Sequence, residues 1–165
     1  AAYWDPELTK PCLAHEAVHQ FVHLTSRFMY MYPEWFHEGL ADTLADYEIA
    51  DGKLTLATGR GTLGRMRLPL IQEAIREGKS IRFAEFLKLS EKKFQEGSPL
   101  TYAQAWSFCH FLMTFQEGRY RKRLMSFYET VRGGTSSDKA WAKAFEGVKL
   151  DDLEKEWKEF IGGLR

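Results

Sequence analysis

The chain has 165 residues, of which 44% are hydrophobic, and it carries 23 basic and 23 acidic side chains. This length and apolar fraction predict one folded globular domain over residues 1–165 and exclude an intrinsically disordered chain. The formal net charge of +0 leaves no electrostatic footprint for nucleic acid or for an anionic membrane surface, so we expect neither as a partner.

Apolar residues recur at helical spacing through most of the chain, which predicts a mainly α fold. The first helix is expected from about Pro11, a residue that suits a first turn, to about Met29. A second is expected from about Glu34 to Ile49. Residues 47–59 read YEIADGKLTLATG, and their Asp-Gly pair between short apolar runs predicts a β-hairpin.

The glycine-bearing stretch GRGTLGRMR at 59–67 lacks the spacing of a phosphate-binding loop, so we interpret it as a connection. Beyond it, apolar periodicity and helix start signals predict a series of helices. Their expected ranges are 68–77, 82–89, 100–117, 119–132, 137–146 and 151–163.

The first predicted helix contains the motif HEAVH at 15–19. Because a helix places positions i and i+4 on one face, His15 and His19 can bind one ion, with Glu16 beside them. Two histidines that are satisfied within a core would give a similar pattern, so the motif alone leaves both interpretations open. His23 continues the same face but lies about 12 Å from His15 along the axis, so we expect it outside the ligand set.

A catalytic zinc site needs a third protein ligand and one open position. The metzincin arrangement is excluded because this chain has Val22 and Thr25 where that class has glycine and histidine. Glu38, 19 positions after His19, is the alternative ligand on the second predicted helix. His37 is a rival candidate, but it points about 100° away from Glu38 around that helix.

HEAVH, 18 intervening residues and EGLAD together resemble the gluzincin metallopeptidases, which include thermolysin and the aminopeptidase-N group. The segment WFHEGLA at 35–41 is similar to the W-x-x-E-G-L-A signature of the peptidase MA-like gluzincins. YAQAWSFCHFL and LEKEWKEFI further along are also similar to that family. The resemblance implies a zincin-type helical metallopeptidase domain that binds Zn²⁺ and hydrolyses peptide bonds in a peptide or protein substrate.

In this scheme His15, His19 and Glu38 hold the zinc ion and Glu16 is the general base. Asp42, one turn after Glu38, can accept a hydrogen bond from a ligating histidine and fix its tautomer. Small alanines beside Glu38 would allow the two helices to approach each other. The competing interpretation of Glu38, Asp42 and Asp46 is a solvated acidic face.

Gluzincins also supply a tyrosine or histidine that donates to the developing oxyanion, and Tyr102 is the favoured candidate here. It lies 64 positions after Glu38, a distance similar to that in aminopeptidase-like gluzincins. Its predicted helix is apolar nearly all round, so the hydroxyl group needs a partner. The alternatives are a packing role for this tyrosine and His110 as the donor.

These peptidases usually carry a β-sheet lobe before the HExxH helix, and this chain has almost nothing before residue 11. We therefore expect a fragment of a longer chain, extracytoplasmic if a signal peptide was removed. No apolar run has the length of a membrane span. Cys12 and Cys109 are expected to be small buried hydrophobes, with one disulfide as the alternative.

Two further functional hypotheses compete with a zinc peptidase. One is a binding module that keeps the gluzincin fold without catalysis, and the other is a zinc hydrolase of a non-peptide amide. The complete set of His15, His19, Glu38 and Glu16 argues against the first. The sequence does not separate a peptidase from the second.

Overall fold

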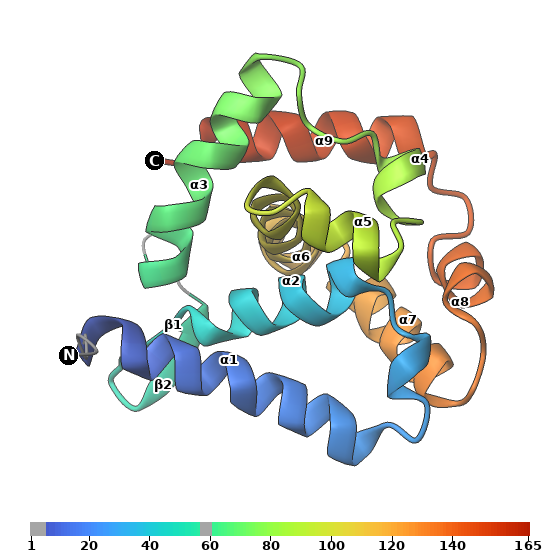
Figure 1. Cartoon of the computed structure of the whole chain (residues 1–165), viewed down its shortest axis with the longest axis horizontal. Helices are drawn as coiled ribbons and strands as arrows, with labels where there is room; N and C mark the ends of the chain where they lie inside the picture. Colours follow the sequence, from blue (N-terminus) through green and yellow to red (C-terminus); the bar gives the residue numbers. More distant parts are fainter. Residues whose placement is uncertain (1–5, 57–60) are drawn as a thin grey trace.

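The computed structural model describes residues 6–56 and 61–165, which form a mainly helical structure with one small antiparallel sheet (Figure 1). The predicted fold class is thereby confirmed. The elements in chain order are α1 (Pro6–Thr25), the 3-10 helix η1 (Met29–Met31), α2 (Glu34–Ala45), β1 (Tyr47–Ala50), β2 (Lys53–Leu56), α3 (Thr62–Arg76), α4 (Phe83–Phe86), α5 (Glu91–Glu96), α6 (Leu100–Gly118), α7 (Arg121–Arg132), α8 (Ser137–Ala144) and α9 (Leu150–Gly163).

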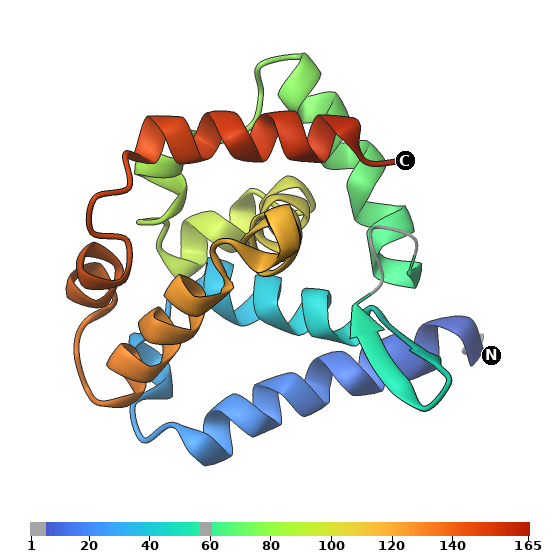
Figure 2. The same ribbon diagram turned by 180° about the vertical axis from the view of Figure 1, so that it is seen from behind.

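Helix α6 is the centre of the fold. In Figures 1 and 2 it is viewed close to its axis, and α2, α3 and α9 lie around it. Residues 103–112 of α6 are all buried, in agreement with the apolar periphery expected from the sequence. The surrounding helices are amphipathic and turn one apolar face toward α6, so they bury a single core between them.

Helices α2 and α6 approach each other closely at Gly39. A Cβ atom built there would lie 2.3 Å from the carbonyl oxygen of Ala105 and 2.8 Å from Sγ of Cys109. Only a residue without a side chain fits this spacing. Gly39 therefore sets the distance between α2 and α6. The same contact determines the position of Glu38, the preceding residue on α2.

The hairpin prediction is confirmed, with Tyr47 paired to Leu56 and Ala50 to Lys53 around a turn at Asp51 and Gly52. Residues 57–59, the expected end of this segment, lie outside the described residues. The predicted helical end at Ile49 was wrong. Helix α2 stops at Ala45 because the backbone leaves the helical region at Asp46 (φ −91°, ψ 71°) and continues as β1.

Helix α1 starts five residues earlier than predicted and ends at Thr25 instead of Met29. Both Pro6 and Pro11 are compatible with a first turn, and the structure uses Pro6 there while the helix runs on through Pro11. Helix α3 begins at Thr62, inside the stretch that we interpreted as a connection. The predicted helix at 82–89 is the short α4, and α5 was not predicted.

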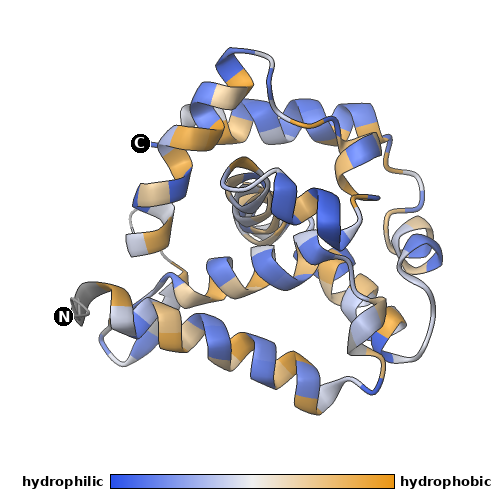
Figure 3. Cartoon of the chain, viewed as in Figure 1, coloured by the Kyte–Doolittle hydropathy of each residue, from blue (hydrophilic) through white to orange (hydrophobic). Residues whose placement is uncertain are grey.

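One face of α1 differs from the sequence-based expectation. The apolar residues of α1 cover about half of its circumference, a pattern that predicts a buried face, but Leu13, Phe21 and Leu24 are 66%, 57% and 75% exposed. Figure 3 shows the mixture of hydrophobic and hydrophilic residues along this helix. Among the described residues, α1 rests on the body of the protein mainly through α2. No helix within residues 6–56 and 61–165 is both long enough and apolar enough to cross a membrane.

Candidate metal centre

Three side chains from α1 and α2 converge on one point. The Nε2 atoms of His15 and His19 are 2.9 Å apart, and the Glu38 carboxylate lies 3.5 Å from the first and 3.7 Å from the second. One ligand atom from each residue lies within 4.8 Å of the others. The helical i, i+4 spacing aligns the two histidines, and the packing of α2 on α1 supplies the carboxylate.

This arrangement fits a metal ion. Tetrahedral zinc with bonds of about 2.0–2.1 Å holds its ligand atoms roughly 3.3 Å apart, close to the three distances observed. Nδ1 of His15 faces the Oδ1 atom of Asp42, so with a proton on this nitrogen the Nε2 atom would present a lone pair to an ion at the cluster. Two neutral imidazoles and one carboxylate are a donor set used by catalytic zinc sites.

Asp42 contacts the Nδ1 side of the His15 ring, away from the Nε2 atom that faces the cluster. Its Oδ1 atom accepts a hydrogen bond from Nδ1 of His15 at 2.9 Å, and its Oδ2 atom lies 2.5 Å from Nε of Arg67 on α3. The Asp42 side chain is 2% exposed, so Arg67 compensates a buried charge that would otherwise be costly. The predicted contact between Asp42 and a ligating histidine is therefore present, and Arg67 is a partner that sequence reasoning missed.

The electrostatics of the cluster favour positive charge. Hydrogen bonds to Asp42 and then to Glu38 raise the pKa of His15 to about 10, against the opposing effect of burial. The two carboxylates thus stabilise a cation at the point where the ligand atoms meet. A divalent ion would satisfy the same carboxylates in place of that proton.

Glu38, Asp42 and Asp46 do not form a solvated acidic face, since all three side chains are buried or partly buried. Asp42 and Asp46 are 1% and 3% exposed. Asp46 accepts hydrogen bonds from the backbone N–H groups of Leu63 and Gly64 at 3.1 and 2.6 Å, so it caps the first turn of α3. This cap positions the helix that carries Arg67 toward Asp42. The sequence signal for this cap is the glycine-rich start of α3, with Gly61 and Gly64, which we interpreted as part of a connection.

The cluster lies in a cleft of about 560 Å³. Glu16 lines this cleft beside the histidines and is exposed. The other lining residues outside the ligand set come from α1, α2, α3 and α6, and they are Cys12, Asp42, Leu63, Arg67 and Tyr102. Cys12 is exposed and Cys109 is buried, and both thiols are free, so these residues form no disulfide.

Tyr102 reaches the cleft from the first turn of α6. Its ring lies 5.3 Å from the guanidinium group of Arg67, and its hydroxyl group donates a 3.1 Å hydrogen bond to Oε1 of Gln95. Burial raises the pKa of Tyr102, and the charges of Glu38 and Glu34 add to the effect. The ring is thus in the same cleft as the ligands, while the role of the hydroxyl as an oxyanion donor stays a prediction.

The remaining histidines lie outside the ligand cluster. His110 is 1% exposed and stacks on Trp106 and Phe160, on the side of α6 that faces α9. Burial lowers its pKa to about 4. It does not line the cleft, which removes the geometric basis for His110 as the alternative donor. His23 is exposed near the end of α1, and His37 lies against the ring of Tyr32.

The comparisons with known proteins give one match. A family described as "Protein of unknown function (DUF1570)" matches residues 11–138, a segment that contains the metal cluster, Glu16, Asp42, Arg67 and Tyr102. No curated protein and no solved structure matches the chain. Since the match spans more than half of its length, the chain belongs to the DUF1570 family of proteins of unknown function.

Proposed function

We propose that this protein is a zinc-dependent metallopeptidase. The observation that carries the proposal is the convergence of His15, His19 and Glu38 in one cleft with a fourth residue, Glu16, that is free to act as a base. The sequence resemblance to peptidase MA-like gluzincins supports the same assignment. The three ligands would hold the ion through two imidazole nitrogens and a carboxylate.

A bound zinc ion lowers the pKa of a water molecule to about 7 and polarises the carbonyl group to be cleaved. Glu16 accepts a proton from the attacking water and delivers it to the nitrogen of the departing amine. Its position one residue after His15 directs it away from the ligand pair and toward the same cleft. Its exposure keeps the carboxylate accessible.

Two further residues complete the proposed mechanism. Asp42 keeps Nδ1 of His15 protonated, so that Nε2 presents its lone pair to the ion. The Tyr102 hydroxyl exchanges its bond to Gln95, an exposed residue of the short α5, for one to the oxygen that gains negative charge. A single hydrogen bond to an exposed side chain is easily replaced, which makes this exchange feasible.

The experiment combines metal analysis with peptide cleavage. The zinc-loaded protein is incubated with a peptide library, the products are identified by mass spectrometry, and zinc is measured by elemental analysis. We expect about one equivalent of zinc per chain and defined cleavage products. Glu16→Gln keeps the zinc and loses at least about 10²-fold in cleavage rate, because the amide cannot accept the proton.

His19→Ala and His23→Ala form a matched pair on one helix. His19→Ala loses the zinc, while His23→Ala, an exposed position one turn further on, keeps both zinc and activity. Stoichiometric zinc in a His15→Ala/His19→Ala double variant would remove the assigned site. A zinc-loaded chain that cleaves no peptide, or equal cleavage by Glu16→Gln, would contradict the peptidase.

A further inference from the structure

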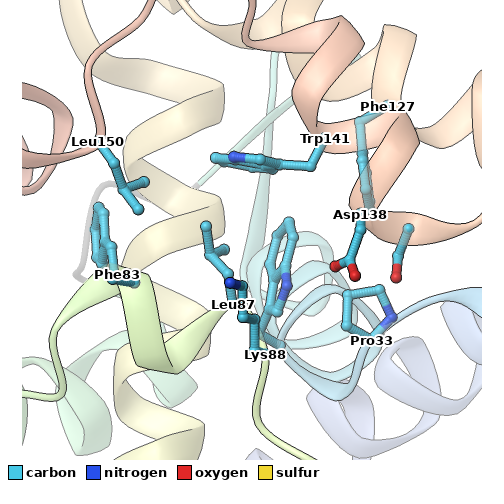
Figure 4. A pocket seen from close by; sticks show the side chains of 11 residues that line it. Pro33, Phe83, Leu87, Lys88, Phe127, Asp138, Trp141 and Leu150 are labelled. Atoms are coloured by element: carbon cyan, nitrogen blue, oxygen red, sulfur yellow. The ribbon is translucent and has the colours of Figure 1, made fainter.

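A second pocket lies on another part of the molecule, where α2, α4, α7 and α8 meet. It has a volume of about 350 Å³ (Figure 4). Its floor is aromatic and fully buried: Trp35, Phe83 and Phe127 are 2%, 0% and 0% exposed. Pockets of this size with mainly apolar and aromatic walls are typical of small-molecule sites. We call it the aromatic pocket.

Trp141 offers an aromatic surface to this pocket. One face of its indole ring is covered by Phe145, at a centroid distance of 3.8 Å and an interplanar angle of 13°. Figure 4 shows the ring edge-on above the space that Leu87 and Phe83 border. Trp35 stands nearly perpendicular to it at 5.7 Å. An aromatic ring entering the pocket can therefore contact the indole ring of Trp141 within a group of aromatic side chains that also includes Trp35 and Phe127.

The mouth of the aromatic pocket is charged. Lys88 and Asp138, both exposed, lie among its lining residues, and neither side chain forms an ion pair with another described residue. Ser137 adds a hydroxyl group beside Asp138. Two opposite charges at the entrance of an apolar pocket suit a ligand that is apolar at one end and carries both charges at the other.

We propose that the aromatic pocket binds a free aromatic amino acid, with the ring against Trp141, the carboxylate at Lys88 and the ammonium group at Asp138. An aromatic residue within a peptide lacks one or both of these charges, so the free amino acid is the better fit. The site shares no lining residue with the metal cleft, and the inference is independent of the proposed peptidase activity.

Calorimetric titration and ligand-observed NMR with L-phenylalanine and L-tryptophan test this site, on the whole chain both with and without zinc. Three comparison ligands each lack one feature: phenethylamine lacks the carboxylate, 3-phenylpropionate lacks the ammonium group, and L-alanine lacks the ring. We expect each to bind at least about tenfold more weakly than L-phenylalanine, and chelation of zinc to leave the affinities unchanged.

The variants assign each charge to its partner. Lys88→Ala weakens L-phenylalanine binding about tenfold and removes its advantage over phenethylamine, while Asp138→Ala removes its advantage over 3-phenylpropionate. Lys92→Ala and Lys139→Ala are exposed controls outside the pocket and change neither affinity. Ala84→Trp, at an exposed lining position, fills the space without removing a wall and abolishes binding.

Three results would overturn the inference. No binding of either amino acid at about 10 mM, a concentration that detects millimolar affinities, excludes the ligand class. Equal affinity for L-phenylalanine and for the two singly charged analogues shows that the charged mouth selects nothing. Binding that survives Ala84→Trp places the ligand elsewhere on the molecule.

Discussion

The Oδ1 atom of Asp42 lies 2.9 Å from Nδ1 of His15, so a buried carboxylate on α2 orients a candidate metal ligand on α1. Loss of such a contact typically weakens metal binding 10- to 100-fold. We therefore expect Asp42→Ala to lower zinc affinity by about that factor, measured by competition with a chelator. Asp152→Ala, at an exposed position on α9 outside the cleft, is the control and keeps the affinity. Equal affinity in Asp42→Ala and the unmodified protein would show that the contact does not support the ligand.

Tyr102→Phe removes one oxygen and keeps the ring that contacts Arg67 and Phe94. The loss of one oxyanion donor costs about 10²–10³ in turnover, and we expect kcat to fall by that order with a smaller change in KM. Zinc content and thermal stability are expected to survive. Tyr120→Phe is the matched control, since its hydroxyl donates to Glu156 outside the cleft. A normal kcat for Tyr102→Phe would exclude this tyrosine as the donor.

Gly39→Ala places a methyl group 2.3 Å from the carbonyl oxygen of Ala105, a distance that no real contact tolerates. Helix α2 must move outward, and we expect the free energy of unfolding to fall by about 1–3 kcal/mol. Because Glu38 moves with α2, zinc affinity is expected to drop as well. Chemical denaturation and chelator competition measure the two effects.

Gly162→Ala on α9 is the control for Gly39→Ala, because a Cβ atom there meets nothing within 4 Å. Alanine is the better helix former, so this change is expected to be neutral or slightly stabilising. If both glycine variants had the same stability, the close approach of α2 and α6 would not depend on Gly39.

His110 is expected to make the protein sensitive to acid. Its pKa is about 4 in the folded chain and 6.5 in the unfolded chain, so the unfolded state binds the proton more readily between these values. The free energy of unfolding therefore decreases as the pH falls below 6.5, and it is about 2 kcal/mol lower at pH 5. His110→Phe keeps a ring between Trp106 and Phe160 and removes the titration.

Denaturation of the metal-free protein at pH 7 and pH 5 measures this effect. The stability of His110→Phe relative to the unmodified chain is expected to rise by about 2 kcal/mol between the two conditions. Using the difference between two variants removes the contributions of other titrating groups, including His15. A difference that does not change with pH would show that His110 is not buried in its neutral form.

Several features of this protein follow from local sequence alone. The apolar spacing of residues 100–117 predicts a buried helix, and α6 is helical there up to Thr114, because periodicity is a property of one helix and needs no partner. The same holds for the shared face of His15 and His19, which the helical repeat dictates. Asp51-Gly52 determines the hairpin turn in the same way.

Other features depend on how the helices pack. The position of Glu38 beside the histidines requires the close approach of α2 to α6 at Gly39, and the pairing of Asp42 with Arg67 requires α3 to start at the cap that Asp46 provides. The exposure of Leu13 and Phe21 on α1 also departs from the pattern. Helical periodicity determines which residues share a face, but it carries no information about which element packs on that face, or how closely. Those distances are set by contacts between residues far apart in the chain, so only the tertiary structure decided them.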